Sequence, residues 1–199
     1  FVPSRGLGDV YKRQDQLRER MRKTVDPELD RLIFGVTDSE HLFYYLLSAL
    51  GRAGVPIDGK GPVDTAVAAR ALREAISDLF AWAKELNLDP PKINFILTNG
   101  KVFIAQRAGL ELYLATQKNT CADFDTCNEP DKVCMMGIMP PLSRLLKTGG
   151  RRKCNHLLVA SEPIGDEDIW EEIPEGTMVV MDESFHVDIH PGPQPFWIT

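Results

Sequence analysis

The sequence has no apolar run of the roughly 20 residues needed to span a bilayer, and no excess of positive charge. Its 23 Lys and Arg stand against 29 Asp and Glu, which gives a net charge of −6. That balance argues against nucleic acid or an anionic membrane surface as a partner. The one basic run, 147–153, contains two glycines and is interpreted as a solvated loop. No signal-peptide pattern is present, so we expect a cytoplasmic protein.

The sequence also lacks the spacings that bind nucleotides or metal ions. No Gly-rich loop follows an expected strand, so nucleotide binding has no support. The histidines are scattered, and none is spaced with a carboxylate on one face of an expected element. We therefore expect no cofactor and no bound metal ion. The four histidines are His41, His156, His186 and His190.

Close cysteine pairs are absent as well. Successive cysteines are separated by five, six and nineteen residues, unlike the close pairs of a zinc knuckle. Acidic neighbours disfavour the thiolate of Cys121, which argues against a nucleophile there. We favour buried or semi-buried thiols that close an irregular loop, because disulfides are disfavoured in a cytoplasmic setting. A non-catalytic module with a metal-binding loop remains the alternative. The cysteines are Cys121, Cys127, Cys134 and Cys154.

The start of the chain is atypical of a native protein. Residue 1 is Phe1, and no Met precedes Met21. Residues 9–14 resemble the translation of a transposon end used in making sequencing libraries, so we expect residues 1–14 to be an assembly artefact. Native sequence is then expected from near Asp15. The remainder is interpreted as one domain portion over 15–189 and an irregular tail over 190–199.

What is present is enough for a folded domain. In 199 residues, 43% are hydrophobic, which can fill a sizeable core. Helices are predicted over 15–24 and, after a break at Asp26-Pro27, over 27–33. Apolar residues at three- and four-residue steps predict two longer helices. The first begins at Asp38 and ends near Gly51, and the second runs from about Ala69 to Leu86.

The second half changes to strand patterns. Residues 93–97 and 102–104 alternate in polarity, and Asn99-Gly100 between them predicts a two-residue hairpin turn. Further strands are expected over 110–116 and over 157–160, the latter a buried one. A closing hairpin is expected from 177–181 and 185–189. Two helices followed by antiparallel strands predict an α+β layered domain.

The start of the Asp38 helix carries the most informative pattern. Thr37 and Glu40 have the spacing of a capping box. In this motif the Thr37 hydroxyl accepts a hydrogen bond from the Glu40 amide, and the Glu40 side chain reaches back toward the start of the helix. Asp38 then sits at the first helical position without a local partner. The positive end of the helix dipole keeps its carboxylate ionised, which suits an ammonium ligand. The alternative is an acidic residue placed only for the dipole. His41 is interpreted either as a neighbour of the Asp38 ligand or as an ordinary half-exposed side chain.

Four segments in order resemble the class II glutamine amidotransferase domain, an N-terminal-nucleophile hydrolase. They are GVTDSE at 35–40, NFILTNG at 94–100, LVASEP at 158–163 and WEEIPEG at 170–176. Their order and spacing are similar to the single-domain bacterial branch, and the resemblance covers nearly all of 15–189. It implies a four-layer αββα sandwich, incomplete at its amino-terminal side, with helices outside two stacked antiparallel sheets.

The resemblance also implies a reaction. In the family, an N-terminal Cys attacks a glutamine or γ-glutamyl amide, an Asn-Gly pair forms the oxyanion hole, and an Arg holds the substrate carboxylate. An Asp in the TDSE element binds the substrate α-ammonium, and this role maps onto Asp38. The other groups belong to the family's amino-terminal part, and Asn99-Gly100 is a hairpin turn rather than the oxyanion pair. We therefore expect this chain to be an inactive, marginally stable carboxy-terminal fragment.

Two forms of the parent activity stay open. Ammonia released from glutamine would pass to a synthase partner, or the hydrolysis itself would be the purpose, as in a γ-glutamyl amidohydrolase of the ergothioneine-pathway type. Both forms take a small-molecule glutamine or γ-glutamyl substrate.

Overall fold

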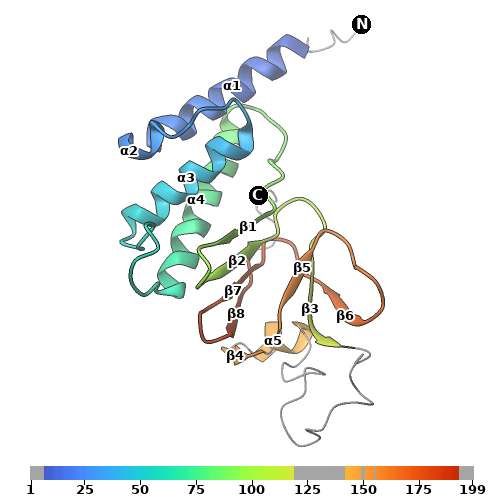
Figure 1. Ribbon diagram of the computed structural model, residues 1–199. Helices are drawn as coiled ribbons and strands as arrows, with labels where there is room; N and C mark the ends of the chain where they lie inside the picture. Colours follow the sequence, from blue (N-terminus) through green and yellow to red (C-terminus); the bar gives the residue numbers. More distant parts are fainter. Residues whose placement is uncertain (1–6, 119–141, 149–150, 155, 193–199) are drawn as a thin grey trace, which may run out of the picture. The chain divides into compact units, whose positions relative to one another are not determined.

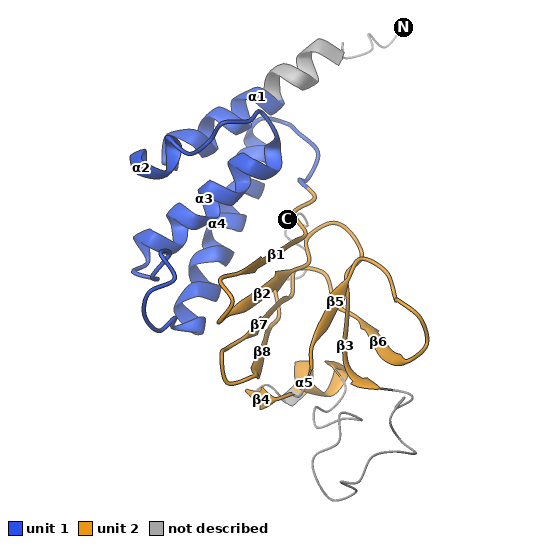
Figure 2. Ribbon diagram, viewed as in Figure 1, with its two compact units in different colours: residues 1–91, 199 blue, residues 92–198 orange. Residues whose placement is uncertain are grey.

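The computed structural model describes residues 7–118, 142–148, 151–154 and 156–192, with side chains from Gln14 onward except that of Thr148. The chain divides into two compact units at the Pro91–Lys92 boundary (Figure 2). Each unit is described by itself. None of the helices in these described residues is long and apolar enough to cross a membrane.

The first unit is helical (Figure 1). The predicted break after the first helix is confirmed, but the segment after it is a single turn. The helix at Asp38 begins where predicted and runs past Gly51, while the next begins before Ala69 because Asp64 caps it by accepting the Ala66 and Val67 amides. The helices are α1 (Leu7–Thr24), α2 (Pro27–Asp30), α3 (Asp38–Arg52) and α4 (Thr65–Glu85).

Helix α3 is covered on more than one side, because both α1 and α4 contact it. The Tyr45 hydroxyl donates to the Ala75 carbonyl of α4 at 3.0 Å, and the Tyr45 ring contacts Trp82. The apolar residues at helical spacing in α3 are only partly buried: Leu46 and Leu50 are buried, but Phe43 is exposed. The buried positions of α3 are His41, Tyr45, Leu46, Ser48, Ala49 and Leu50.

The second unit contains two antiparallel sheets. The five-stranded sheet has the order β1-β2-β7-β8-β4, and the three-stranded sheet has the order β5-β3-β6. This agrees with the predicted α+β class; the four-layer arrangement stays a prediction. The elements are β1 (Phe95–Thr98), β2 (Phe103–Gln106), β3 (Tyr113–Lys118), α5 (Leu142–Thr148), β4 (Arg152–Lys153), β5 (Leu158–Ala160), β6 (Asp168–Glu172), β7 (Met178–Met181) and β8 (His186–His190).

Both predicted hairpins are confirmed by antiparallel pairing of β1 with β2 and of β7 with β8. The first turn is centred one residue later than predicted. Thr98 pairs with Phe103, so the central residues are Gly100 and Lys101. Asn99 contributes through its side chain, which accepts the Lys101 and Val102 amides, and Gly100 takes a φ of 82°. The strand predicted over 157–160 is not buried, because β5 is an edge strand with Leu158 exposed.

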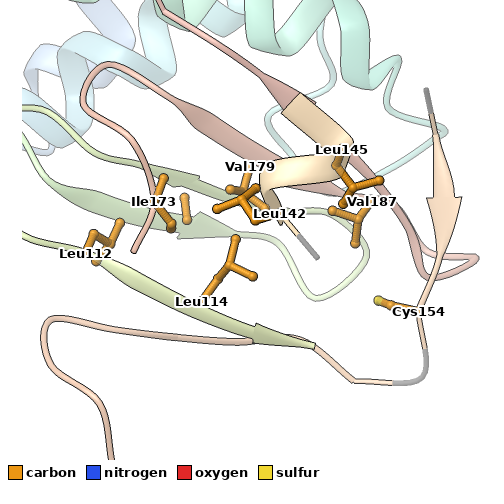
Figure 3. Close-up of a cluster of buried hydrophobic side chains, with 9 residues drawn as sticks. Leu112, Leu114, Leu142, Leu145, Cys154, Ile173, Val179 and Val187 are labelled. Carbon is orange, nitrogen blue, oxygen red and sulfur yellow. The ribbon is translucent and has the colours of Figure 1, made fainter. Parts of the chain in front are cut away.

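The core of this unit lies between the two sheets (Figure 3). Val179 and Val187 come from the five-stranded sheet, Leu114 from the three-stranded sheet, and Leu142 and Leu145 from α5. Full burial of such side chains stabilises a fold by about 1.5–3 kcal/mol each. The rest of the buried cluster consists of Ala105, Leu112, Cys154 and Ile173.

Of the cysteines, Cys154 is described, and it is a buried free thiol. Burial raises its pKa, so it is protonated and unreactive at neutral pH. Cys121, Cys127 and Cys134 lie outside the described residues. Within the described residues, no group of three or more His, Cys, Asp and Glu side chains is placed to hold a metal ion.

Candidate functional site

The amino-terminal end of α3 forms a hydrogen-bonded cap. Thr37 is the N-cap residue, and its hydroxyl accepts the Glu40 amide at 3.4 Å, as predicted. The Glu40 carboxylate reaches back past Thr37 and accepts the Phe34 amide at 3.0 Å and the Gly35 amide at 2.8 Å. The predicted capping box is therefore confirmed in its first half, while in its second half Glu40 bonds to the amides two and three residues before Thr37 rather than to that of Thr37. This cap fixes the backbone on which Asp38 stands.

Asp38 has a partner that its local sequence did not show. The Arg18 guanidinium donates to Asp38 Oδ1 from Nη2 at 2.7 Å and from Nε at 3.0 Å. No described residue near Asp38 in the sequence bonds to its carboxylate, as predicted, but the carboxylate is not uncommitted in the fold. The reason is that α1 packs beside α3 and brings together residues that are 20 positions apart in sequence. Arg18 also donates to Asp15 Oδ1 at 3.3 Å.

The site remains open to solvent. The Asp38 side chain is 70% exposed, whereas Arg18 is 28% exposed. Both bonds from Arg18 go to one oxygen, so within the described part of the chain Asp38 Oδ2 has no hydrogen-bond partner. A carboxylate in this position can bind a second cationic group from solvent.

His41 lies in the same turn of α3 and is buried, 4% exposed. The interpretation as a half-exposed side chain is therefore wrong. Burial lowers its pKa, as does the positive charge of Arg18 and Arg22, while Glu40 and Asp38 oppose this. The imidazole is therefore neutral at pH 7. Its Nδ1 is buried without a hydrogen-bond partner.

This arrangement can bind a cation but does not by itself perform a reaction. It offers an exposed carboxylate at the positive end of a helix, next to a buried neutral imidazole. In the described part of the chain, no hydroxyl or thiol nucleophile is hydrogen-bonded to His41, whose Nδ1 is unpartnered. The described residues around Asp38 thus offer an exposed carboxylate but no nucleophile paired with a base.

A second charged cluster, in the other unit, was not predicted. Arg107 is 13% exposed and pairs with Glu172 at 2.6 Å and with Glu175 at 3.4 Å, and its guanidinium also donates to the Ile173 carbonyl. Glu175 in turn accepts the Gly109 amide at 2.8 Å. The acidic residues of 170–176 could have indicated a basic partner, but not which one. These contacts hold the segment between β6 and β7 against Arg107, the residue that follows β2.

The histidine interpretation also missed a pair in this unit. His156 Nε2 lies 3.5 Å from Asp168 Oδ1, and both side chains are largely buried. His156 lies two residues before β5 and Asp168 begins β6, and these two strands lie on either side of β3.

Comparison with known proteins supports the fold. No protein-family model matches the sequence, and no curated protein matches it. Among solved structures, the chain is similar to a glutamine aminotransferase class-II domain protein from Silicibacter pomeroyi, with a TM-score of 0.54 and 18% identity. The match covers 89% of this chain, which spans 62% of the length of that structure. The chain therefore has a mixed α/β fold with antiparallel sheets, similar to that class II neighbour.

Proposed function

We propose that the chain is part of a class II glutamine amidotransferase-like enzyme of the N-terminal-nucleophile type. The observation that carries this proposal is the structural similarity to the Silicibacter pomeroyi protein over 89% of the chain. The order of the four family-like segments in the sequence supports it. The intact enzyme would hydrolyse the side-chain amide of glutamine or of a γ-glutamyl compound.

In this proposal Asp38 binds the α-ammonium group of the substrate. Its carboxylate is exposed and stands on a rigid helix start, held by the bonds of Thr37 and Glu40. It already holds one cationic group, the Arg18 guanidinium, at 2.7 Å. A charge-assisted hydrogen bond to an ammonium group is among the stronger single contacts in a binding site.

The nucleophile would be an N-terminal cysteine outside this chain. Cys154 is unsuited to the role, because it is buried in the core between the sheets and burial raises its pKa. The attacking thiolate would form a thioester with release of ammonia, and water would then release the carboxylate product. The ammonia would be passed to a synthase partner or discarded.

The test is a glutaminase assay on the product of the complete gene. We expect it to release L-glutamate and ammonia from L-glutamine, and expect residues 1–199 alone to be inactive. Asp38→Asn should lower kcat/KM by about 10- to 150-fold, the effect of losing a hydrogen bond to a charged group.

Asp78→Asn is the matched control, because Asp78 is an exposed aspartate on α4 of the same unit. We expect it to leave kcat/KM unchanged. Absence of glutaminase activity in the complete protein would overturn glutamine as the substrate, and absence of hydrolysis of γ-glutamyl amides as well would overturn the proposed reaction. Full activity of Asp38→Asn would overturn the role of Asp38.

A further inference from the structure

The charges around Asp38 form a group of three in which acid exceeds base. Arg18 lies between two carboxylates, with Nη2 at 2.7 Å from Asp38 and Nη1 at 3.3 Å from Asp15. One guanidinium thus faces two aspartates, and the group has a formal charge of −1.

We propose that Arg18 is an internal competitor of the substrate, a latch that occupies the Asp38 carboxylate until an α-ammonium group replaces it. The inference rests on the proposed function, in which Asp38 binds that ammonium. It adds a residue that sets substrate affinity without contacting the reacting atoms. Arg18 is therefore a positioning residue rather than a catalytic one.

The exchange replaces one cation by another on the same carboxylate, so the charge on Asp38 stays balanced. Arg18 has an alternative partner in Asp15, and it can keep that contact when it leaves Asp38. The Asp38 side chain is 70% exposed, and exposed ion pairs are weak enough to exchange with a ligand.

The other charged groups near the site are engaged elsewhere. Arg22 pairs with Asp30 at 2.7 Å, and the Glu40 carboxylate is bonded to two backbone amides of the cap. Neither is hydrogen-bonded to Asp38, so among the described residues Arg18 is the cation that competes for this carboxylate.

When Arg18 occupies Asp38, the apparent affinity for the α-ammonium ligand is reduced. It equals the intrinsic affinity multiplied by the fraction of molecules in which Asp38 is free. Since exposed ion pairs are weak, the reduction should be about two- to fivefold. Removing the guanidinium should tighten binding by that factor. It should do so for ligands that carry an α-ammonium group.

The experiment measures binding by calorimetry to the product of the complete gene. The probes are L-glutamate, the non-reacting product that carries the α-ammonium group, and glutarate, which lacks it. Arg18→Met keeps the aliphatic stem and removes the charge, and Arg18→Gln is a second neutral replacement. Arg20→Met is the matched control, because Arg20 is on the same helix and pairs with Glu85 instead.

The latch predicts that both Arg18 variants bind L-glutamate about two- to fivefold tighter, with no tightening for glutarate or in Arg20→Met. Unchanged or weaker L-glutamate binding in the Arg18 variants, together with weakened binding in Asp38→Asn, would overturn the latch and leave the role of Asp38 intact. Equal tightening of glutarate would also overturn it. Unchanged L-glutamate affinity in Asp38→Asn would overturn the role of Asp38 and the latch with it.

Discussion

The Glu40 carboxylate accepts the backbone amide of Gly35 at 2.8 Å, in space that a side chain at position 35 would fill. A Cβ there would overlap Glu40 Oε2. The absence of a side chain at Gly35 is thus a condition for the cap of α3. The position of Asp38 depends on that cap.

Gly35→Ala should therefore destabilise the protein by about 1–2 kcal/mol, because Glu40 must leave the amides it caps. Urea unfolding followed by circular dichroism measures this. Gly51→Ala is the matched control on the same helix, where the nearest atom to a new Cβ is Ile57 Cδ1 at 3.7 Å. It should be neutral or stabilising by up to about 1 kcal/mol. A Gly35→Ala protein as stable as wild type would contradict the role of the cap.

Arg107→Met should destabilise the protein by about 2–4 kcal/mol. The substitution leaves Glu175 and Glu172 without their cation and the Ile173 carbonyl without a donor. The measurement is the free energy of unfolding in urea. Arg151→Met is the control: Arg151 pairs with Asp182 but is 52% exposed, so the loss should stay within about 1 kcal/mol. Equal losses in the two variants would show that the burial of Arg107 contributes nothing.

His41 should make the protein less stable in acid. Burial lowers its pKa in the folded state, so the unfolded chain takes up the proton first as the pH falls. Stability due to this group is therefore level above about pH 6.5 and decreases below it. Urea midpoints at about pH 7.5 and 5.0 measure the slope, which should be smaller in His41→Gln. The same slope in both proteins would contradict this assignment.

Cys154 should resist alkylation while the protein is folded. Its thiol is buried and its pKa is raised, so both access and thiolate content are low. Peptide mass spectrometry after brief iodoacetamide treatment should find Cys154 unmodified in buffer and modified in denaturing urea. Rapid labelling without denaturant would place the thiol outside the core.

Local patterns in the sequence predicted the local structure well. The start of α3 at Asp38 and the hydroxyl half of its cap follow from neighbouring residues, as do the two hairpins. The turn was misplaced by one residue because Asn99 acts through its side chain rather than as a central residue. Such a detail depends on the strand register, which alternation alone does not fix.

The contacts that define the two charged clusters could not be predicted from local sequence patterns, because they join residues far apart in the sequence. Arg18 and Asp38 are 20 residues apart, and Arg107 and Glu172 are 65 apart. A carboxylate without a local partner in the sequence is therefore not without a partner in the fold. The burial of His41 was missed for the same reason, because it depends on how neighbouring helices cover α3.

The segment from Ile173 to Thr177 joins a strand of one sheet to a strand of the other. Arg107 binds along it, through Glu172, Glu175 and the Ile173 carbonyl. Because this connection is short, it limits the distance between the two strands that it joins. Natural variation in length should accumulate in the other connections of this unit, since one added residue here would force the layers apart or shift a strand out of register.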